Sequence, residues 1–484
     1  MQTTNGAVSL ATSADARLDL FFKTVRNANC LFDTHDNANL HTLIDASWRV
    51  DPLDTMKILF NWRDCRGGKG DHDGFIVAMA YIERTYPEWF DANIAVIPEY
   101  GSYLDWVKLW HMVSCDGKIT IMNLIVKQLC EDMGSSPISL LAKWIPSENS
   151  KWDRWGSTKE KPKDRFLHGL CREMFGVQNV NKRSLRDLRV NYITPLRRDL
   201  KLVESRLCER KYDQIDYEKV PGVAMNKYKK AFQRNDPIRF KEYLHDVHTG
   251  KAGIKAGQMY PHDLVRQYMS CDKEDPVIEA QWAELKRQTL ETGAFDDSVI
   301  VCDVSGSMNG TPMEVAIALG ILGMNNNRLI TFSEFPELHY VPDGLLYTQV
   351  QNVMGMNWGG STNFQSVMNL VLGMCVTGSA IKRVFVFSDM QFDVAFSDPC
   401  ATNFEAMRAK FSTANLELPQ IVFWNLRGQT GDFPVCCNEH GVVMLSGFSP
   451  SLLKGVLSGK EMTPLGVMLE IIHSPRYDRV IMKE

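Results

Sequence analysis

The sequence of 484 residues lacks long apolar runs and a recognisable targeting segment. No window reaches the roughly 18 apolar residues that a membrane-spanning helix needs. Residues 1–15 are polar and rich in small side chains, without the basic flank or apolar core of a secretory signal. We therefore expect a cytoplasmic protein with a flexible N-terminus (1–15). The composition, 44% hydrophobic and 23% charged, is that of a globular protein, and the length allows two or three domains.

The residue patterns of common metal sites and hydrolases are also missing. The 12 cysteines form no Cys-x-x-Cys pair and no Cys/His cluster at zinc spacing, so we expect reduced, mostly buried thiols. None of the 11 histidines shows the His-Glu-x-x-His spacing of a metallohydrolase. A phosphatase of the haloacid type would need an acid two positions after Asp303, where Ser305 stands, and the glycines around Ser307 do not form a Gly-x-Ser-x-Gly elbow. We expect no enzymatic activity.

A glycine-rich turn, Arg-Asp-Cys-Arg-Gly-Gly-Lys-Gly, occupies residues 63–70. A phosphate-binding Walker loop would have Gly at position 63 and Ser or Thr at position 70, so nucleotide binding is not expected. Two interpretations stay open. The turn is either a tight connection between helices in which Arg63 pairs with Asp64 or Asp71, or a site where exposed backbone amides meet an RNA phosphate.

What the sequence does contain is an oxygen-rich stretch at residues 298–310. A short, β-branched apolar run ends abruptly at Asp303, as expected for a buried central strand. Ser305 and Ser307 follow at alternate positions, and Gly306 allows the backbone to bend between them. In an extended loop the three side-chain oxygens can turn toward one point, which is how a hard cation is held.

The Asp-x-Ser-x-Ser pattern resembles the metal-ion-dependent adhesion site of von Willebrand factor A domains, whose further ligands are a Thr in a second loop and an Asp in a third. Thr362, within Gly-Gly-Ser-Thr-Asn-Phe, and Asp389, which follows the apolar run 384–387, stand in the expected order. The resemblance implies one Mg²⁺ or Mn²⁺ bound directly by Ser305, Ser307 and Thr362. Asp303 and Asp389 would act largely through water, and a carboxylate from a protein ligand would complete the coordination.

The periodicity of apolar residues divides the chain at residue 293. Residues 16–292 show helical spacing with few strand-like runs, which favours an all-α array of degenerate, HEAT-like helix pairs. Residues 293–484 alternate strands and helices, which predicts a mainly parallel, doubly wound α/β domain. Expected strands are 298–302, 328–332, 382–387, 420–425 and 441–445; expected helices are 314–324, 343–354, 363–375 and 404–411, with two more at the end.

The helical part resembles known RNA-binding modules. Residues 63–70 and 97–101 resemble the helical-repeat (TROVE) module of the Ro autoantigen, and residues 143–149 and 223–230 resemble more closely an uncharacterised family of large-virus and plant proteins that couples such helices to a von Willebrand A domain. Ro proteins bind RNA ends in a ring of helical repeats and structured RNA on a basic outer face. The resemblance therefore implies a Ro-like ribonucleoprotein component with single-stranded or structured RNA as partner.

A basic segment supports an anionic partner. Residues 151–250 contain 24 Lys and Arg against 14 Asp and Glu, a net charge of +10 in a chain whose net charge is −4. Trp152 and Trp155 lie in a polar, basic stretch (147–163), where they either stack on bases or plug the loop onto the helices. The candidate RNA-binding residues are Lys182, Arg183, Arg186, Arg189, Arg197, Arg198, Lys227, Lys229, Lys230, Trp152 and Trp155. The alternative is that such charges are solvated faces.

A second functional hypothesis needs no RNA. Met308, Met356 and Trp358 flank the predicted metal loops and either pack within their own domain or offer an apolar rim to a partner. In the latter case the protein is a metal-dependent scaffold for protein assembly.

Overall fold

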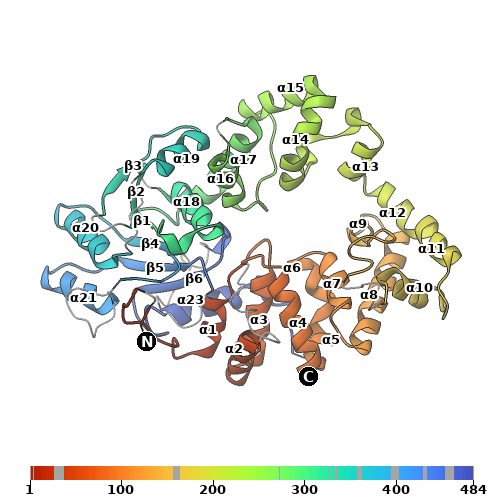
Figure 1. Ribbon diagram of the computed structural model, residues 1–484, viewed down its shortest axis with the longest axis horizontal. Coiled ribbons are helices and arrows are strands. Elements are labelled where there is room, and N and C mark those ends of the chain that lie inside the picture. The colour runs from red at the N-terminus through yellow and green to blue at the C-terminus, as the bar shows by residue number, and fades with distance from the viewer. Residues whose placement is uncertain are drawn as a thin grey trace. The chain divides into compact units, whose positions relative to one another are not determined.

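The computed structural model describes residues 2–3, 5–26, 38–155, 164–271, 273–324, 326–332, 336–356, 362–393, 403–428, 433–452 and 463–482 (Figure 1). The chain divides into two compact units. Unit 1 comprises residues 1–71 and 217–477, and unit 2 comprises residues 72–216 and 478–484. The boundary expected at residue 293 thus falls inside unit 1, which combines the sheet with the first and last helices of the helical part.

Unit 2 is built from helices, as the apolar spacing predicted. They are α4 (Asp73–Thr85), α5 (Pro87–Asn93), α6 (Ile97–Tyr100), α7 (Leu104–Trp110), α8 (Cys115–Gly134), α9 (Leu141–Trp144), α10 (Phe166–Phe175), α11 (Lys182–Leu188), the π-helical turn η4 (Arg189–Ile193), α12 (Thr194–Asp199) and α13 (Val203–Cys208). The longest, α8, begins where the Ser114 side chain accepts a hydrogen bond from the Gly117 amide. Its buried residues Ile121, Ile125 and Leu129 recur every fourth position, which gives one apolar face.

The helices of unit 1 that precede the sheet in sequence are α1 (Ala16–Lys23), α2 (Ala38–Val50), α3 (Pro52–Arg63), α14 (Gly222–Asn235), α15 (Pro237–His248), α16 (Pro261–Met269) and α17 (Pro276–Leu290). Several begin at a proline, whose missing N–H costs nothing in the first turn. Among the described residues of both units, no helix has the length and apolar character to cross a bilayer.

The sheet of unit 1 has six strands in the order β3-β2-β1-β4-β5-β6. The strands are β1 (Ser298–Cys302), β2 (Arg328–Thr331), β3 (Leu338–Tyr340), β4 (Arg383–Ser388), β5 (Gln420–Asn425) and β6 (Val442–Ser446). Neighbours pair in parallel except β2 and β3, which are antiparallel. The accompanying helices are α18 (Thr311–Gly323), α19 (Leu346–Met354), α20 (Phe364–Val376), α21 (Asn403–Thr413) and α23 (Pro464–Ile472). The predicted strands and these first four helices match within a few residues, whereas β3 was not predicted.

Burial explains why the central strands could be predicted from the sequence. Every residue of β1 is buried, as are all residues of β4 except the first, because helices pack on a parallel sheet and leave little of it in water. Helix α18 packs so closely on β1 that a Cβ at Gly320 would lie 2.3 Å from the Cys302 sulfur. Glycine at this position permits the contact.

The described cysteines carry free thiols, but the expectation that most are buried is wrong. Only Cys171 and Cys302 are buried, and those exposed to solvent are Cys115, Cys130, Cys208 and Cys271. Two of the exposed thiols, Cys115 and Cys130, belong to α8.

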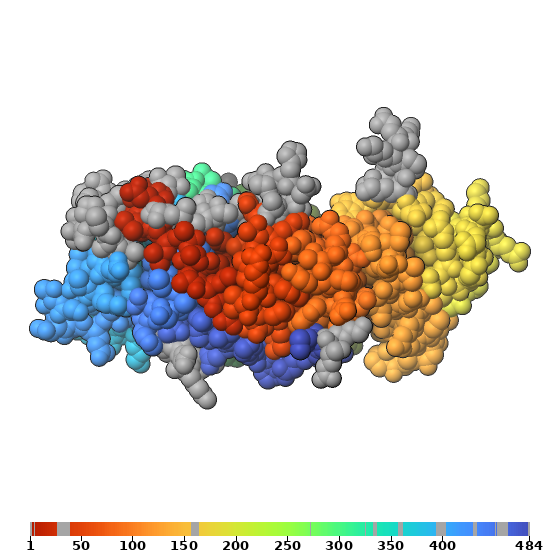
Figure 2. Space-filling view, turned by 90° about the horizontal axis from the view of Figure 1, so that it is seen from below, coloured from red at the N-terminus to blue at the C-terminus, as the bar shows by residue number. Residues whose placement is uncertain are grey.

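The N-terminal residues also differ from the expectation of a flexible segment. Gly6 forms a β-bridge with Asp393, and Leu10 forms one with Phe433. Ser13 is buried, and its hydroxyl donates to the Asp19 carboxylate at 2.6 Å. The described residues 2–3 and 5–13, here called the N-terminal arm, begin with a hairpin in which Gln2 bridges Val8, and they pack against other parts of unit 1. Figure 2 shows the red N-terminal part of unit 1 beside its blue C-terminal part.

Candidate metal centre

The predicted metal residues lie where the strand order reverses. The chain runs outward from β1 to β2 and β3, and then returns to β4 on the other side of β1. In open α/β sheets such a reversal leaves a crevice at the carboxyl ends of the two strands, and ligands bind there. Asp303 directly follows β1 and Asp389 directly follows β4. The fold thus brings both predicted acids to the carboxyl ends of two neighbouring strands.

Asp303 is a buried carboxylate held by its neighbours. The Ser388 hydroxyl donates to one carboxylate oxygen at 2.6 Å, and the Ser305 backbone amide donates to the other at 3.0 Å. Burial raises the pKa of Asp303 to about 6, and the negative charge of Asp389 contributes to the shift. Two buried carboxyl groups that repel each other are stabilised when a cation lies between them.

Asp389 is 2% exposed, and one of its carboxylate oxygens, Oδ2, is buried without a hydrogen-bond partner. The other oxygen accepts the Gln391 amide at 3.2 Å. Burial raises the pKa of Asp389, while the Ser307 hydroxyl, the Gln391 amide and the Arg427 guanidinium favour its ionised form. Buried carboxylate oxygens nearly always have a partner, so this atom is one that an ion or water would satisfy.

Hydroxyl groups complete the candidate centre. The side-chain oxygens of Ser305 and Ser307 lie 3.1 Å apart. Thr362, which is buried, lies beside the third loop because its carbonyl accepts the Asp393 amide at 3.1 Å. The structure therefore gathers the five predicted ligands at one edge of the sheet, where Asp303, Ser305, Ser307, Thr362 and Asp389 all belong to loops after strands or before α20. The rest of the second loop, including Trp358, lies outside the described residues.

Two supporting residues were missed by the sequence prediction. Ser388 fixes Asp303, and the only signal for it was a hydroxyl directly before the third acid. Arg427, after β5, donates to the backbone carbonyl of Ser307 and gave no local signal at all.

The chemistry of the donor set is selective. Within the described ranges, no group of three or more His, Cys, Asp or Glu side chains is arranged to hold a metal ion. The candidate centre has two carboxylates and three hydroxyls, which are oxygen ligands suited to a hard cation such as Mg²⁺.

The basic helices of unit 2 contrast with this centre. Lys182, Arg183, Arg186, Arg189 and Arg198 are exposed on α11, η4 and α12. Their neighbour Arg197 points inward, and its guanidinium donates to the carbonyls of residues 142 and 145 at 2.8 and 2.6 Å. Five candidate residues are thus accessible, while Arg197 is used to hold the end of α9.

The basic residues of α14, in unit 1, divide in the same way. Lys227 and Lys230 are exposed. Lys229 is buried, where it pairs with Asp275 at 2.7 Å and donates to the Gln267 side chain at 3.1 Å. Its charge therefore has an internal partner.

The two tryptophans pack against α7. Trp152 and Trp155 lie edge to face with ring centroids 5.5 Å apart, and Trp155 stands edge-on to His111 at 5.6 Å. The His111 ring and the Trp152 carbonyl are 2.7 Å apart. These contacts favour the interpretation that the rings plug the loop onto the helices. Residues 156–163 of this loop lie outside the described residues.

The glycine-rich turn is packed inside unit 1. Lys69 is fully buried; its ammonium donates to the carbonyls of Phe21 and Thr24 and to the Ser446 hydroxyl, the last at 2.8 Å. Asp64 pairs with Arg476 through two contacts of 2.9 Å. These contacts favour the first of the two interpretations, a tight structural connection, but the partner of Asp64 is Arg476 and not the expected Arg63.

Comparison with known proteins places the chain in a family. A family model described as a domain of unknown function, DUF2828, matches residues 3–118 and 120–295, and another domain of unknown function, DUF7788, matches residues 297–468. A viral relative, "Uncharacterized protein L728" of Acanthamoeba polyphaga mimivirus, is 31% identical over 519 residues, which cover 97% of this chain and 86% of the relative. The chain belongs to the DUF2828 family. The two matched regions meet within unit 1, close to the start of β1.

Proposed function

We propose that the protein is a non-enzymatic, divalent-metal-containing binding protein whose sheet is a von Willebrand A-like domain with a metal-ion-dependent adhesion site. The observation that carries the proposal is the buried, unpartnered Oδ2 of Asp389 at the same edge of the sheet as Asp303. Ser305, Ser307 and Thr362 would hold Mg²⁺ or Mn²⁺ directly, and the two acids would act mainly through water.

The donor set also suggests what such a centre does. A cation bound mostly by neutral hydroxyls keeps much of its charge, so it attracts a carboxylate from outside. The side chains named at the centre are two carboxylates and three hydroxyls, which can bind and position a cation. The geometry supports capture of an acidic protein ligand.

Metal titration tests the proposal. Isothermal titration with Mn²⁺ should give one site per chain, and Asp389→Asn should weaken it by about 100-fold because a charged ligand group is lost. Asp343→Asn is the matched control, since Asp343 is an exposed acid of the same unit that lies 3.9 Å from Lys286. Equal affinities for wild type and Asp389→Asn would contradict the proposal.

If the protein acts as a scaffold for protein assembly, a metal ion should bridge the complex. If an acidic segment of another chain completes the coordination, both EDTA and Thr362→Ala should dissociate the complex, whereas RNase should not. Light scattering under each condition measures this, and a complex that survives EDTA and Thr362→Ala would exclude a metal bridge.

RNA binding is the second candidate function, and the exposed basic side chains of α11, η4 and α12 favour it. Arg183 makes a loose ion pair with Asp187, with 3.9 Å between its guanidinium Nε and the carboxylate Oδ2. Such a surface can meet phosphates, and the chain would then be a cytoplasmic ribonucleoprotein component. Fluorescence anisotropy with a labelled single-stranded RNA tests this. Arg186→Glu with Arg189→Glu should abolish binding, while Lys251→Glu with Lys255→Glu, an equal charge change on exposed lysines, should weaken it only slightly.

A further inference from the structure

The N-terminal arm, described at residues 2–3 and 5–13, is hydrogen-bonded to other parts of unit 1 at several points. Leu10 and Phe433 exchange both backbone hydrogen bonds, at 3.0 and 3.1 Å. The Ser13 carbonyl accepts the Cys437 amide at 2.8 Å, and Gly6 forms its bridge with Asp393. These contacts join the arm to two separate loops, one of which follows Asp389.

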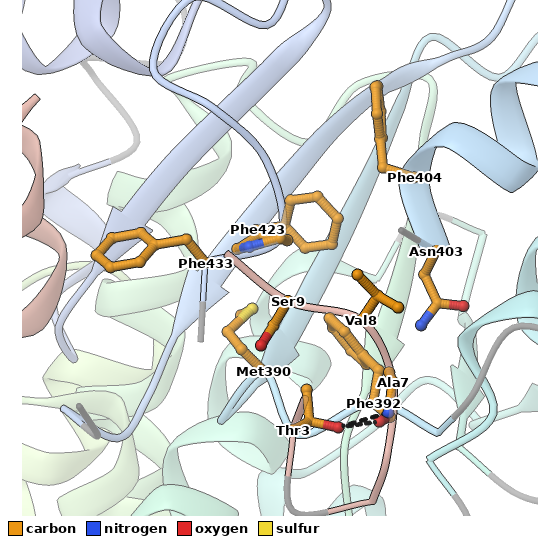
Figure 3. A pocket seen from close by; sticks show the side chains of 11 residues that line it. Thr3, Ala7, Val8, Ser9, Met390, Phe392, Asn403, Phe404, Phe423 and Phe433 are labelled. Atoms are coloured by element: carbon orange, nitrogen blue, oxygen red, sulfur yellow. Dashed lines mark hydrogen bonds between the residues drawn. The ribbon is translucent and has the colours of Figure 1, made fainter. Parts of the chain in front are cut away.

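The arm also fills an apolar groove. Figure 3 shows Ala7, Val8 and Ser9 among side chains from β5, from the start of α21 and from the loops beside them, which are Phe423, Phe404, Met390, Phe392 and Phe433. Ala7 is 1% exposed, and the cavity left beside the arm is about 10 Å³, room for no more than about one water molecule. The Thr3 hydroxyl donates to the Phe392 carbonyl at 2.7 Å. The groove and the arm thus fit closely.

One side chain of the arm reaches the candidate metal centre. The Asn5 amide nitrogen donates to the Gln391 carbonyl at 2.8 Å and to the Thr362 hydroxyl oxygen at 3.3 Å. Gln391 in turn donates its backbone N–H to Asp389. Asn5 therefore links the second and third loops of the centre, and the Thr362 oxygen retains a lone pair for another partner.

We propose that the N-terminal arm is part of the metal centre, with Asn5 as a positioning residue that couples docking of the arm to cation binding. The proposal rests on the proposed function. A docked arm holds Thr362 and the loop at 389–393 in place, so the cation does not have to order them. By linkage, the factor by which docking strengthens cation binding is the factor by which the cation strengthens docking.

The first test expels the arm from the full-length chain. Ala7→Arg places a long charged side chain in the filled groove, whereas Ala11→Arg makes the same change at an exposed position of the same arm. Isothermal titration with Mn²⁺ should show about tenfold weaker binding for Ala7→Arg and wild-type affinity for Ala11→Arg. Asn5→Ala removes the link without disturbing the groove and should weaken binding several-fold.

The second test measures the reciprocal effect in the wild type. Hydrogen exchange at the amides of Leu10 and Phe433, which donate to each other's carbonyls when the arm is docked, should slow when Mg²⁺ replaces EDTA. On adding Mg²⁺, the protection factor of these amides should rise by the same factor by which the wild type binds the cation more tightly than Ala7→Arg does.

The outcomes separate the two proposals. A wild type that binds no cation contradicts the proposed function, and the coupling with it. A wild type that binds the cation, while Ala7→Arg and Asn5→Ala retain its full affinity, contradicts the coupling alone. Arm amides that exchange equally fast in Mg²⁺ and EDTA also overturn the coupling.

Discussion

The sheet edge that carries the candidate metal ligands, here called the metal edge, and the basic helices of unit 2 were both predicted from residue types, yet they differ in how the structure uses them. The acids at the metal edge are far apart in sequence and meet because β1 and β4 are neighbouring parallel strands. The basic residues are close in sequence and separate, because a helix turns successive side chains to different faces. The strand order therefore brings residues that follow different strands to one place. A basic run in the sequence predicts only that the local net charge is positive, and not which side chains are exposed.

Adjacent residues show the difference most clearly. Arg197 caps carbonyl groups inside unit 2, while Arg198 is exposed on the same helix. On α14, Lys229 is buried in an ion pair and Lys230 is exposed. Net charge counts all four side chains alike, so it overstates the surface available to an anion.

The prediction with the largest expected effect tests whether the acids that meet at the metal edge bind a cation. Asp303→Ala should reduce Mn²⁺ affinity by at least about 100-fold, because the acid that fixes the first loop is lost. In EDTA its unfolding free energy should change by less than about 1 kcal/mol, since the lost hydrogen bonds are offset by relief of repulsion with Asp389. Titration calorimetry and urea unfolding measure the two quantities.

A loss of several kcal/mol in the unfolding free energy of Asp303→Ala in EDTA would contradict this prediction. It would mean that the buried carboxylate serves mainly to hold the loop through Ser388 and Ser305. The metal edge would then be a structural feature like the buried lysines.

The second prediction concerns the two lysines of α14. Lys229→Met should lower the free energy of unfolding by about 2–3 kcal/mol, because it leaves Asp275 without its partner. Lys230→Met, the matched substitution one position along, should change it by less than about 0.5 kcal/mol. Urea unfolding compares the two, and equal losses would contradict the assignment of Lys229 to the interior.

Much of the fold could be predicted from the sequence because the central strands are buried on both faces. Such strands read as apolar runs that stop at the loops, so Asp303 and Asp389 were visible as strand ends. The edge strand β3 was missed because it is three residues long and its last residue, Tyr340, is exposed. A strand that short has too few positions to show alternation.

The residues that support the site were harder to predict because their contacts are distant in sequence. Asn5 meets Thr362 and Gln391, and Arg427 meets Ser307, without any local pattern that pairs them. The arm was expected to be flexible because polar, small residues carry little apolar surface. In the structure it is held by backbone hydrogen bonds and by Ala7, which residue type alone does not reveal.

The third prediction tests whether a buried polar atom without a hydrogen-bond partner is by itself sufficient evidence for a cation site. His262 on α16 is buried, and its Nδ1 has no hydrogen-bond partner, like Oδ2 of Asp389. Burial lowers the pKa of His262 to about 3, and the nearby Arg26 and Arg266 contribute. The unfolded chain therefore takes up this proton near pH 6.5 while the folded chain does not, so stability falls as the pH drops from about 6.5.

His262→Gln should remove this part of the pH dependence. Between pH 7 and pH 5 the wild type should lose about 2 kcal/mol more than the variant, as measured by urea unfolding at each pH. Mn²⁺ affinity should be equal in both proteins, because no carboxylate pair accompanies the unpaired nitrogen. A parallel pH dependence in the two proteins would assign the acid sensitivity to other groups.

The smallest expected effect separates Arg197 from Arg198. Arg198→Gln removes one exposed charge, so RNA affinity should fall a few-fold and the slope of log affinity against log salt should become shallower by about 0.7, the value for one phosphate contact on a single strand. Its thermal stability should not change. Arg197→Gln should lower the thermal stability and leave the salt slope unchanged, because its guanidinium is engaged by two backbone carbonyls. Anisotropy titrations at several salt concentrations and thermal unfolding distinguish the variants. If Arg197→Gln also reduces the salt slope while the protein remains equally stable, the charge count would be a better guide to the RNA surface than the exposure of each side chain.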